Sequence, residues 1–184
     1  MRLWRISNFA DLTGKGGLLV AGRWHSRGRP IVYMADHTAA TLIEMLVHFD
    51  IRLSDVPATY QLLAIDVPDD VRFAGVEMDD LPADWLTDLN ATRAIGDGWL
   101  AGHTTALLRV PSAIVPAAFN WLLNPNHPDA ARIKIAEIIR APFDPRLLRQ
   151  PKSAEKRRGR APGRRGRGRS PRPSGGPGRR RSRR

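Results

Sequence analysis

The apolar positions of this chain fall into short runs separated by glycine, proline and charged residues. Residues 3–7 (LWRIS) and 30–35 (PIVYMA) contain the β-branched and aromatic side chains that are typical of strands. Residues 60–68 are almost continuously apolar, which indicates a central strand. Two further strands are predicted at residues 105–112, where a proline stops the run, and at residues 132–138, where apolar and polar positions alternate.

One segment has the period of a helix. In residues 37–49 the apolar side chains recur every three or four positions, and Asp36 in front of them can act as an N-cap. The glycine-rich residues 11–24 and 95–103 are expected to be loops, and a short helix or turn is expected near Trp85.

The order of these elements indicates the fold class. A turn is expected at Asn124–Pro128, a stretch that contains two prolines, before the last strand. The strands do not alternate regularly with long helices, which argues against a doubly wound parallel sheet. The prediction is therefore an α+β domain.

Charge divides the chain at about residue 150. Residues 151–184 hold 15 of the 30 basic residues and one of the 18 acidic residues, so residues 1–150 keep 15 basic and 17 acidic residues. The net charge of +12 therefore belongs to a tail of Arg, Gly, Pro and Ser. Such a tail cannot bury enough apolar area to offset its ordering entropy and is expected to be disordered. Residues 1–150 suit one domain with its own core.

Composition disfavours several other classes of protein. There is no cysteine, so neither a disulfide framework nor a thiolate metal site can form. No apolar run approaches the roughly 20 residues that span a bilayer. The first residues lack the apolar segment of a signal peptide. We therefore expect a cytoplasmic protein.

Familiar motifs for nucleotides and metals are not found. The chain has no GxxxxGK[ST], no GxGxxG between a strand and a helix, and no HExxH. His37, Glu44 and His48 share one face of the predicted helix, but no third ligand at an established spacing joins the pair Glu44 and His48. A solvated polar face is favoured over a metal site.

Two charged residues could carry chemistry, and each also has an ordinary structural explanation. Arg23 follows Gly22 and could present a guanidinium fork to a diphosphate, or it could stack on Trp24 at the surface. Glu44 could bind a ribose hydroxyl and stabilise an oxocarbenium ion, or it could be a solvated carboxylate.

Tyr33 and Ser112 also have an ordinary structural explanation beside a functional one. Tyr33 is most often a core residue with its hydroxyl at an edge, and Ser112 is most often a turn residue after Pro111. Asn120, Asn124 and Asn126, which lie around two prolines, are interpreted as part of a rigid turn. These residues alone predict an α+β domain with a polar cluster, and they assign no reaction.

The same residues carry a resemblance to a known family. The sequence resembles RES-domain proteins, the toxins of bacterial Xre–RES toxin–antitoxin pairs, which are named for an arginine, a glutamate and a serine. These match Arg23 in GRW, Glu44 in LIEMLVH and Ser112 in VPSAIVP. The stretches that match cover nearly all of the body, in order, and include LWRI, YQLLAIDVPDD, LPADW, AIGDGWL, NWLLNPNHPD and FDPRLL.

The resemblance implies a fold, an activity and a partner. The fold would be similar to that of ADP-ribosyltransferase toxins, with short strands in a split sheet flanked by helices. The activity would consume NAD⁺ by hydrolysis or phosphorolysis, or would ADP-ribosylate a protein, with no metal. An Xre-type antitoxin would block the site.

The resemblance also implies roles for individual residues. Arg23 would grip the NAD⁺ diphosphate or the adjacent ribose, and Tyr33 would lie beside the nicotinamide. Glu44 would bind ribose hydroxyls and stabilise the oxocarbenium ion, and Ser112 would support the pocket. Three further residues are expected to bind NAD⁺ as neighbours: Arg5, Trp24 and Asn126.

Three features depart from the family pattern. His25 stands where Asn is common after GRW, and Asp36 stands where a small polar residue is common. These leave the choice between water, phosphate and a protein as acceptor open. The basic tail is not part of the pattern. The tail could bind nucleic acid weakly and without sequence preference, in a protein whose RES-like body is inactive. Alternatively, the tail could be a solvated extension.

Overall fold

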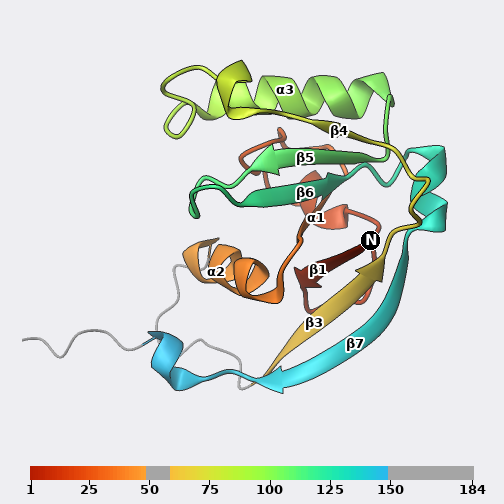
Figure 1. The fold of residues 1–184 in the computed structure, drawn as a ribbon, viewed down its shortest axis with the longest axis vertical. Coiled ribbons are helices and arrows are strands. Elements are labelled where there is room, and N and C mark those ends of the chain that lie inside the picture. The colour runs from red at the N-terminus through yellow and green to blue at the C-terminus, as the bar shows by residue number, and fades with distance from the viewer. Residues whose placement is uncertain (49–58, 149–184) are drawn as a thin grey trace, which may run out of the picture. The chain divides into compact units, whose positions relative to one another are not determined.

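The computed structural model describes residues 1–48 and 59–148, which form a mixed sheet with helices packed around it (Figure 1). The strands are β1 (Arg2–Ile6), β2 (Val32–Ala35), β3 (Thr59–Asp66), β4 (Phe73–Gly75), β5 (Leu107–Pro111), β6 (Phe119–Leu123) and β7 (Lys134–Pro142). The helices are α1 (Lys15–Leu19), α2 (Thr38–His48) and α3 (Leu89–Gly102), with the 3-10 helices η2 (Met78–Asp80), η3 (Pro128–Arg132) and η4 (Pro145–Leu148). The strand order is β4-β5-β6-β2-β1-β3-β7, with β4 and β5 parallel and the other neighbours antiparallel. The predicted α+β class is confirmed.

The expected split of the sheet lies between β1 and β2. These two strands share the single residue pair Trp4 and Ala35, whereas β2 and β6 pair from Val32 to Ala35 and β1 and β3 pair from Arg2 to Ile6. Two half-sheets therefore meet at one point and diverge beside α2 (Figure 1). A gap between diverging strands is a natural place for a ligand.

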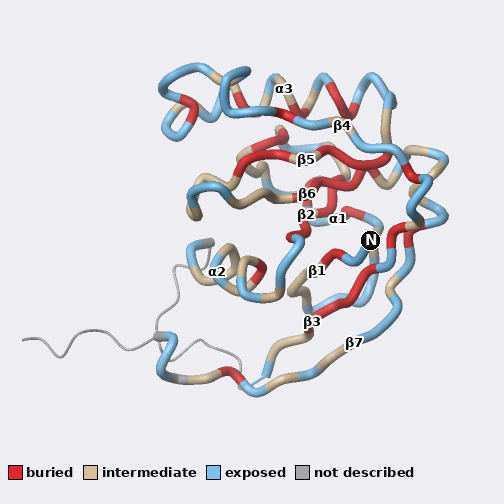
Figure 2. Tube along the Cα trace, viewed as in Figure 1, coloured by how far each residue is buried: buried red, intermediate tan, exposed pale blue. Residues whose placement is uncertain are grey.

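The sheet carries a separate apolar cluster on each face. Successive residues of β5 point to opposite faces, so Leu107 belongs to one cluster and Leu108 to the other. The second cluster includes Trp99 and Leu100 of α3, which therefore covers that face. Burial is concentrated in β3, β5 and β6, while α2 keeps an exposed side (Figure 2).

Most predicted strands and the predicted helix at residues 37–49 are present, but the loop predicted at residues 95–103 is wrong. Residues 95–102 belong to α3, whose N-cap Asp88 accepts a hydrogen bond from the backbone N–H of Asn90. Its buried residues Thr92, Gly96, Trp99 and Leu100 follow a helical spacing. Two of the glycines in the predicted loop lie on different sides of the helix. Gly96 is buried, whereas Gly98 is exposed.

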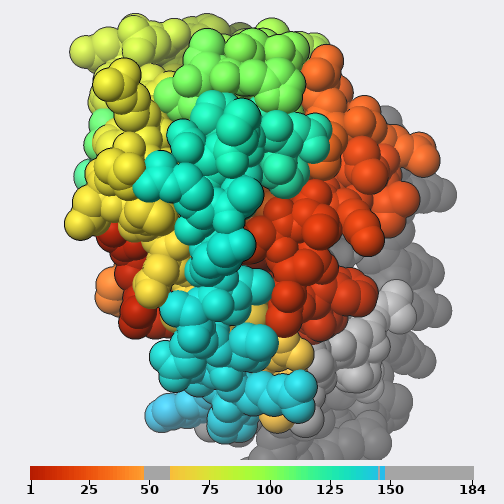
Figure 3. All heavy atoms as spheres, turned by 90° about the vertical axis from the view of Figure 1, so that its right-hand side faces the viewer, coloured from red at the N-terminus to blue at the C-terminus, as the bar shows by residue number. Residues whose placement is uncertain are grey.

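Some short elements were not anticipated. Helix α1 lies inside the predicted loop at residues 11–24, and β4 and β6 escape notice because each is a run of only a few residues. β6 leads into the predicted turn at Asn124–Pro128, and this turn, η3 and β7 follow one another along the face shown in Figure 3. None of the helices in residues 1–48 and 59–148 is long and apolar enough to cross a membrane. The basic tail lies outside the described residues.

Candidate active site

Two adjoining cavities lie beside β2, the first of them where β1 and β2 diverge, and together we name them the cleft. The first has a volume of about 280 Å³ and the second about 470 Å³. Four residues line both cavities: Gly22, Tyr33, Glu44 and Asn120. Because they are shared, these residues form the junction through which one elongated ligand could occupy both cavities.

Glu44 is held by two side chains from neighbouring strands. Its Oε1 accepts a hydrogen bond from the Ser112 hydroxyl at 2.9 Å and from Asn120 Nδ2 at 2.6 Å. Ser112 Oγ itself accepts hydrogen bonds from the backbone N–H groups of Ile114 and Val115, both at 3.1 Å. These two donors direct the hydroxyl proton of Ser112 to Glu44. Glu44 of α2 is therefore held at the junction by Ser112, another residue of the family motif, and by Asn120.

Asn120 is a site residue that sequence reasoning missed. It lies on β6, opposite Ala35 of β2 and Val110 of β5. In the sequence, its position near Asn124 and Asn126 suggests a rigid turn instead. The available signal was its position in FNWLL, where a polar amide interrupts an apolar strand.

Tyr33 faces the cleft from β2 in a network with His25. Gly22 N–H donates to His25 Nδ1 at 3.2 Å, so Nδ1 is an acceptor and must also receive the Tyr33 hydroxyl proton, at 2.9 Å. His25 Nε2 then carries the ring proton and donates it to the Val20 carbonyl at 3.1 Å. The Tyr33 oxygen accepts from Trp24 N–H at 3.1 Å, which completes the network.

The charge states of this pair follow from burial. Removal from water lowers the pKa of His25, which favours the neutral ring that the network requires. Burial likewise raises the pKa of Tyr33, so its hydroxyl remains protonated and available as a donor. His25, one of the departures from the family pattern, thus braces the tyrosine.

The loop at residues 22–24 is clamped by α3. Arg93 Nε donates to the Gly22 carbonyl at 2.9 Å, and the Thr92 hydroxyl donates to the Arg23 carbonyl at 2.7 Å. The next carbonyl, of Trp24, lies against Gly96 so closely that a Cβ built there would be 1.8 Å from its oxygen. Three successive carbonyls of the loop are thus held by one helix.

Arg23 projects from this loop into the second cavity. Its NH1 donates to the Trp85 carbonyl at 3.1 Å, and its Cζ lies 5.8 Å from the centre of the Trp85 ring. The arginine therefore rests on Trp85 and not on Trp24, the neighbour considered in the sequence. The side chain thus stacks on an aromatic ring other than the one expected and also lines the cavity.

Arg5 of β1 lines the first cavity. Its Nε is buried, and among the described residues it has no hydrogen-bond partner. Burial lowers the pKa of this guanidinium, because the charged form loses water. A buried donor without a partner is rare in proteins and is a feature that a bound ligand could satisfy.

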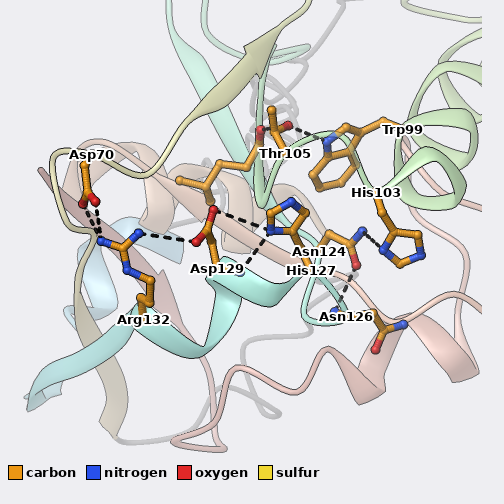
Figure 4. A network of polar contacts seen from close by, with 10 residues as sticks. Asp70, Trp99, His103, Thr105, Asn124, Asn126, His127, Asp129 and Arg132 are labelled. Carbon is orange, nitrogen blue, oxygen red and sulfur yellow. Dashed lines mark hydrogen bonds and ion pairs between the residues drawn. The ribbon is translucent and has the colours of Figure 1, made fainter.

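The other two expected NAD⁺-binding residues are placed differently. Trp24 borders the second cavity but is only 1% exposed, and its ring packs 6.2 Å from that of Trp85 in the core. Asn126 is exposed and lines neither cavity. Figure 4 shows it after β6, where its backbone N–H donates to Asn124 Oδ1 in a network that includes His103. The structure therefore does not bring Asn126 to the cleft.

One of the residues on the helix face considered for a metal, His37, has a structural role instead. His37 Nδ1 accepts the backbone N–H of Ala39 at 3.1 Å, which braces the start of α2. Within residues 1–48 and 59–148, no group of three or more His, Asp or Glu side chains is arranged to hold a metal ion. The side chain of His48 is not among those described.

The mixed sheet, its split, and the cleft centred on one carboxylate define the class of the protein: an α+β domain with one elongated binding site. The match to sequence families is then specific. The RES domain matches residues 2–144, and the chain belongs to this family.

Relatives agree with this assignment. A protein named Toxin Res from Pseudomonas putida is 46% identical over 135 residues, which are 73% of this chain and 92% of that protein. A Prs ADP-ribosylating toxin from Sphingobium sp. is 37% identical over 158 residues, 80% of this chain and 96% of that protein. In structure, the chain is similar to one in the crystal structure of the M. tuberculosis MbcT-MbcA toxin-antitoxin complex, with a TM-score of 0.61 over 79% of this chain and 85% of that chain, at 19% identity. This last likeness concerns the fold.

Proposed function

We propose that this protein is a toxin that consumes NAD⁺ by breaking the bond between nicotinamide and ribose. The observation that carries the proposal is the placement of Glu44 at the junction of the two cavities, held through Oε1 by Ser112 and Asn120. Tyr33 lines the same junction. Membership of the RES family, with relatives named as toxins, supports this function for the site.

The chemistry requires little more than orientation and one negative charge. When the glycosidic bond breaks, both of its electrons go to the ring nitrogen, and nicotinamide leaves as a neutral molecule. The ribose carbon is left as an oxocarbenium ion, which the Glu44 carboxylate stabilises because the group is already in place before charge develops. An acceptor then attacks this carbon, and water as acceptor loses a proton to the solvent.

The two cavities suit the two ends of the substrate. The first is lined largely by apolar groups, including Ile6, Met34 and Met45, and would take the flat nicotinamide ring beside Tyr33. The second contains Arg23 and would take the diphosphate, to which a guanidinium donates parallel hydrogen bonds. Glu44 between them then lies at the nicotinamide ribose.

A second function differs only in the acceptor. The Sphingobium relative is named as an ADP-ribosylating toxin, and at 37% identity this favours a protein side chain as an alternative to water or phosphate. The bond that breaks and the role of Glu44 are the same in both cases. We propose an Xre-type antitoxin as the partner and the cytoplasm as the location, both from the family resemblance.

The test is NAD⁺ turnover by the purified protein without an antitoxin, with and without phosphate, followed by mass spectrometry. Nicotinamide release that is lost in Glu44→Gln and kept in Glu137→Gln, an exposed glutamate of β7, would support the proposal. ADP-ribose as the second product identifies water, ADP-ribose 1″-phosphate identifies phosphate, and a mass increase on an added protein identifies a protein acceptor. Full turnover by a folded Glu44→Gln variant would show that the role assigned to this residue is wrong.

A further inference from the structure

Arg93 of α3 is a second arginine in the second cavity, and neither the sequence motifs nor the proposed mechanism uses it. It lines the cavity with Arg23, while Glu44 is the only acid among the described residues that line it. Two guanidinium groups and one carboxylate leave this part of the cleft with an excess of positive charge. The cavity is therefore suited to an anion.

Arg93 is fixed through its Nε atom, whereas the terminal NH1 and NH2 groups of its guanidinium are not. Its Nε donates to the Gly22 carbonyl at 2.9 Å, which sets the direction of the side chain. Among residues 1–48 and 59–148, no partner is found for NH1 and NH2 of Arg93. An arginine is thus held in place with two donors still available to a ligand.

The acid that could have neutralised Arg93 is engaged elsewhere. Asp97 lies one turn further along α3, at a spacing that often forms an ion pair. Its Oδ1 instead forms an ion pair with Arg29 Nε at 3.0 Å and accepts a hydrogen bond from the backbone N–H of Ser26, also at 3.0 Å. Asp97 is therefore paired with Arg29, and the positive charge of Arg93 acts on the cavity.

Arg23 and Arg93 approach the cavity from two different supports. Arg23 is anchored on Trp85, and Arg93 on the Gly22 carbonyl, so each has part of its guanidinium bonded to the protein. We propose that the two arginines form a diphosphate subsite, in which Arg93 binds the ligand through NH1 and NH2. This inference rests on the proposed function for the identity of the natural ligand, but it makes its own prediction about anions.

The consequence is a specificity for ligands that carry a diphosphate. Hydrogen bonds between charged groups contribute more than neutral ones, and the loss of Arg93 should weaken a diphosphate ligand by about 10- to 100-fold. A ligand without phosphate should not respond. Lysine keeps the charge but not the fork, so Arg93→Lys should retain part of the affinity.

The experiment is calorimetric titration of the full chain with ADP and, separately, with nicotinamide. We expect Arg93→Gln to weaken ADP binding by at least tenfold, Arg93→Lys to weaken it less, and both to bind nicotinamide as the unmodified protein does. Arg72→Gln, at an exposed arginine outside both cavities, is the matched control and should change neither. In turnover, Arg93→Gln should raise KM for NAD⁺ with little change in kcat.

The outcomes separate the subsite from the reaction. Equal ADP affinity with and without Arg93, or no ADP binding by the unmodified protein, would overturn the subsite. Equal weakening of ADP and nicotinamide would also overturn it, because that result would show Arg93 to be only a brace for Gly22. ADP binding that depends on Arg93, in a protein that leaves NAD⁺ intact, would support the subsite and contradict the proposed function.

Discussion

Asn120 Nδ2 lies 2.6 Å from Glu44 Oε1, although the two residues are 76 positions apart in the sequence. The pair joins β6 to α2 across the cleft. If this hydrogen bond orients the carboxylate, Asn120→Ala should lower kcat/KM by about 10- to 100-fold, the usual range for a hydrogen bond to a charged group. NAD⁺ turnover measures the effect.

The control for this variant is another asparagine near the same strand. Asn126→Ala removes an exposed amide that lines neither cavity, so turnover should stay within about twofold. Equal losses in the two variants would contradict a specific role for Asn120. They would instead support the earlier expectation that Asn126 binds NAD⁺.

Two glycines of α3 should respond in opposite directions to alanine. At Gly98 no atom lies within 4 Å of a built Cβ, so Gly98→Ala should raise stability by about 0.5–1 kcal/mol through helix propensity. At Gly96 the Cβ would lie 1.8 Å from the Trp24 oxygen, so Gly96→Ala should cost at least about 2 kcal/mol. Denaturant unfolding measures both, and a stabilised Gly96→Ala variant would contradict the close packing of α3 on the loop at residues 22–24.

These glycines also explain which part of the fold escaped prediction. The strand of Tyr33 and the helix of Glu44 could be predicted, because their apolar residues follow the local patterns of a strand and a helix. In α3, the glycines counted as helix breakers, because nothing in the local sequence shows that a carbonyl of Trp24 will approach Gly96. The contact is between residues far apart in the chain, and only the packed structure makes a small residue necessary there.

The candidate site divides in the same way. Arg23, Tyr33, Glu44 and Ser112 could be named from the family motif, and the structure brings them around one cleft. Asn120 and Arg93 could not, because their importance comes from strand register and from the face of a helix that had been predicted as a loop for much of its length. Their roles in binding and turnover stay predictions until the variants are measured.

Stability should depend on pH through His25. Its pKa is lowered in the fold by burial, and both Asp97 and Arg93 also act on it. Below the ordinary value of 6.5, the unfolded chain takes up a proton that the folded chain resists. The free energy of unfolding should therefore fall as the pH decreases from about 6.5 towards the lowered pKa, and it should be constant in this respect above that range.

The measurement compares denaturant unfolding at pH 7 and pH 5. In His25→Asn this part of the decrease should disappear, whereas in His103→Asn it should remain, because His103 is exposed and asparagine tolerates its left-handed backbone with φ of 47°. An unchanged pH dependence in His25→Asn would show that the histidine is not the group responsible.

Nucleic-acid binding, if present, should belong to the basic tail. Residues 151–184 contain 15 basic residues and no aromatic residue, so binding should be electrostatic and should weaken steeply with salt. The full chain and a variant that ends at residue 150 can be compared on single-stranded RNA and duplex DNA at moderate salt. Similar affinities of the two proteins would leave the tail without this role.

The two half-sheets beside the cleft are joined in the sheet only through the residue pair of Trp4 and Ala35. The half-sheet of β1, β3 and β7 carries Arg5 on one side, and that of β2 and β6 carries Tyr33 and Asn120 on the other. A molecule that contacts both half-sheets adds its binding free energy to the single residue pairing that joins β1 to β2. Occupancy of the cleft should therefore slow amide hydrogen exchange along β1 and β2 together, including at residues that do not contact the ligand.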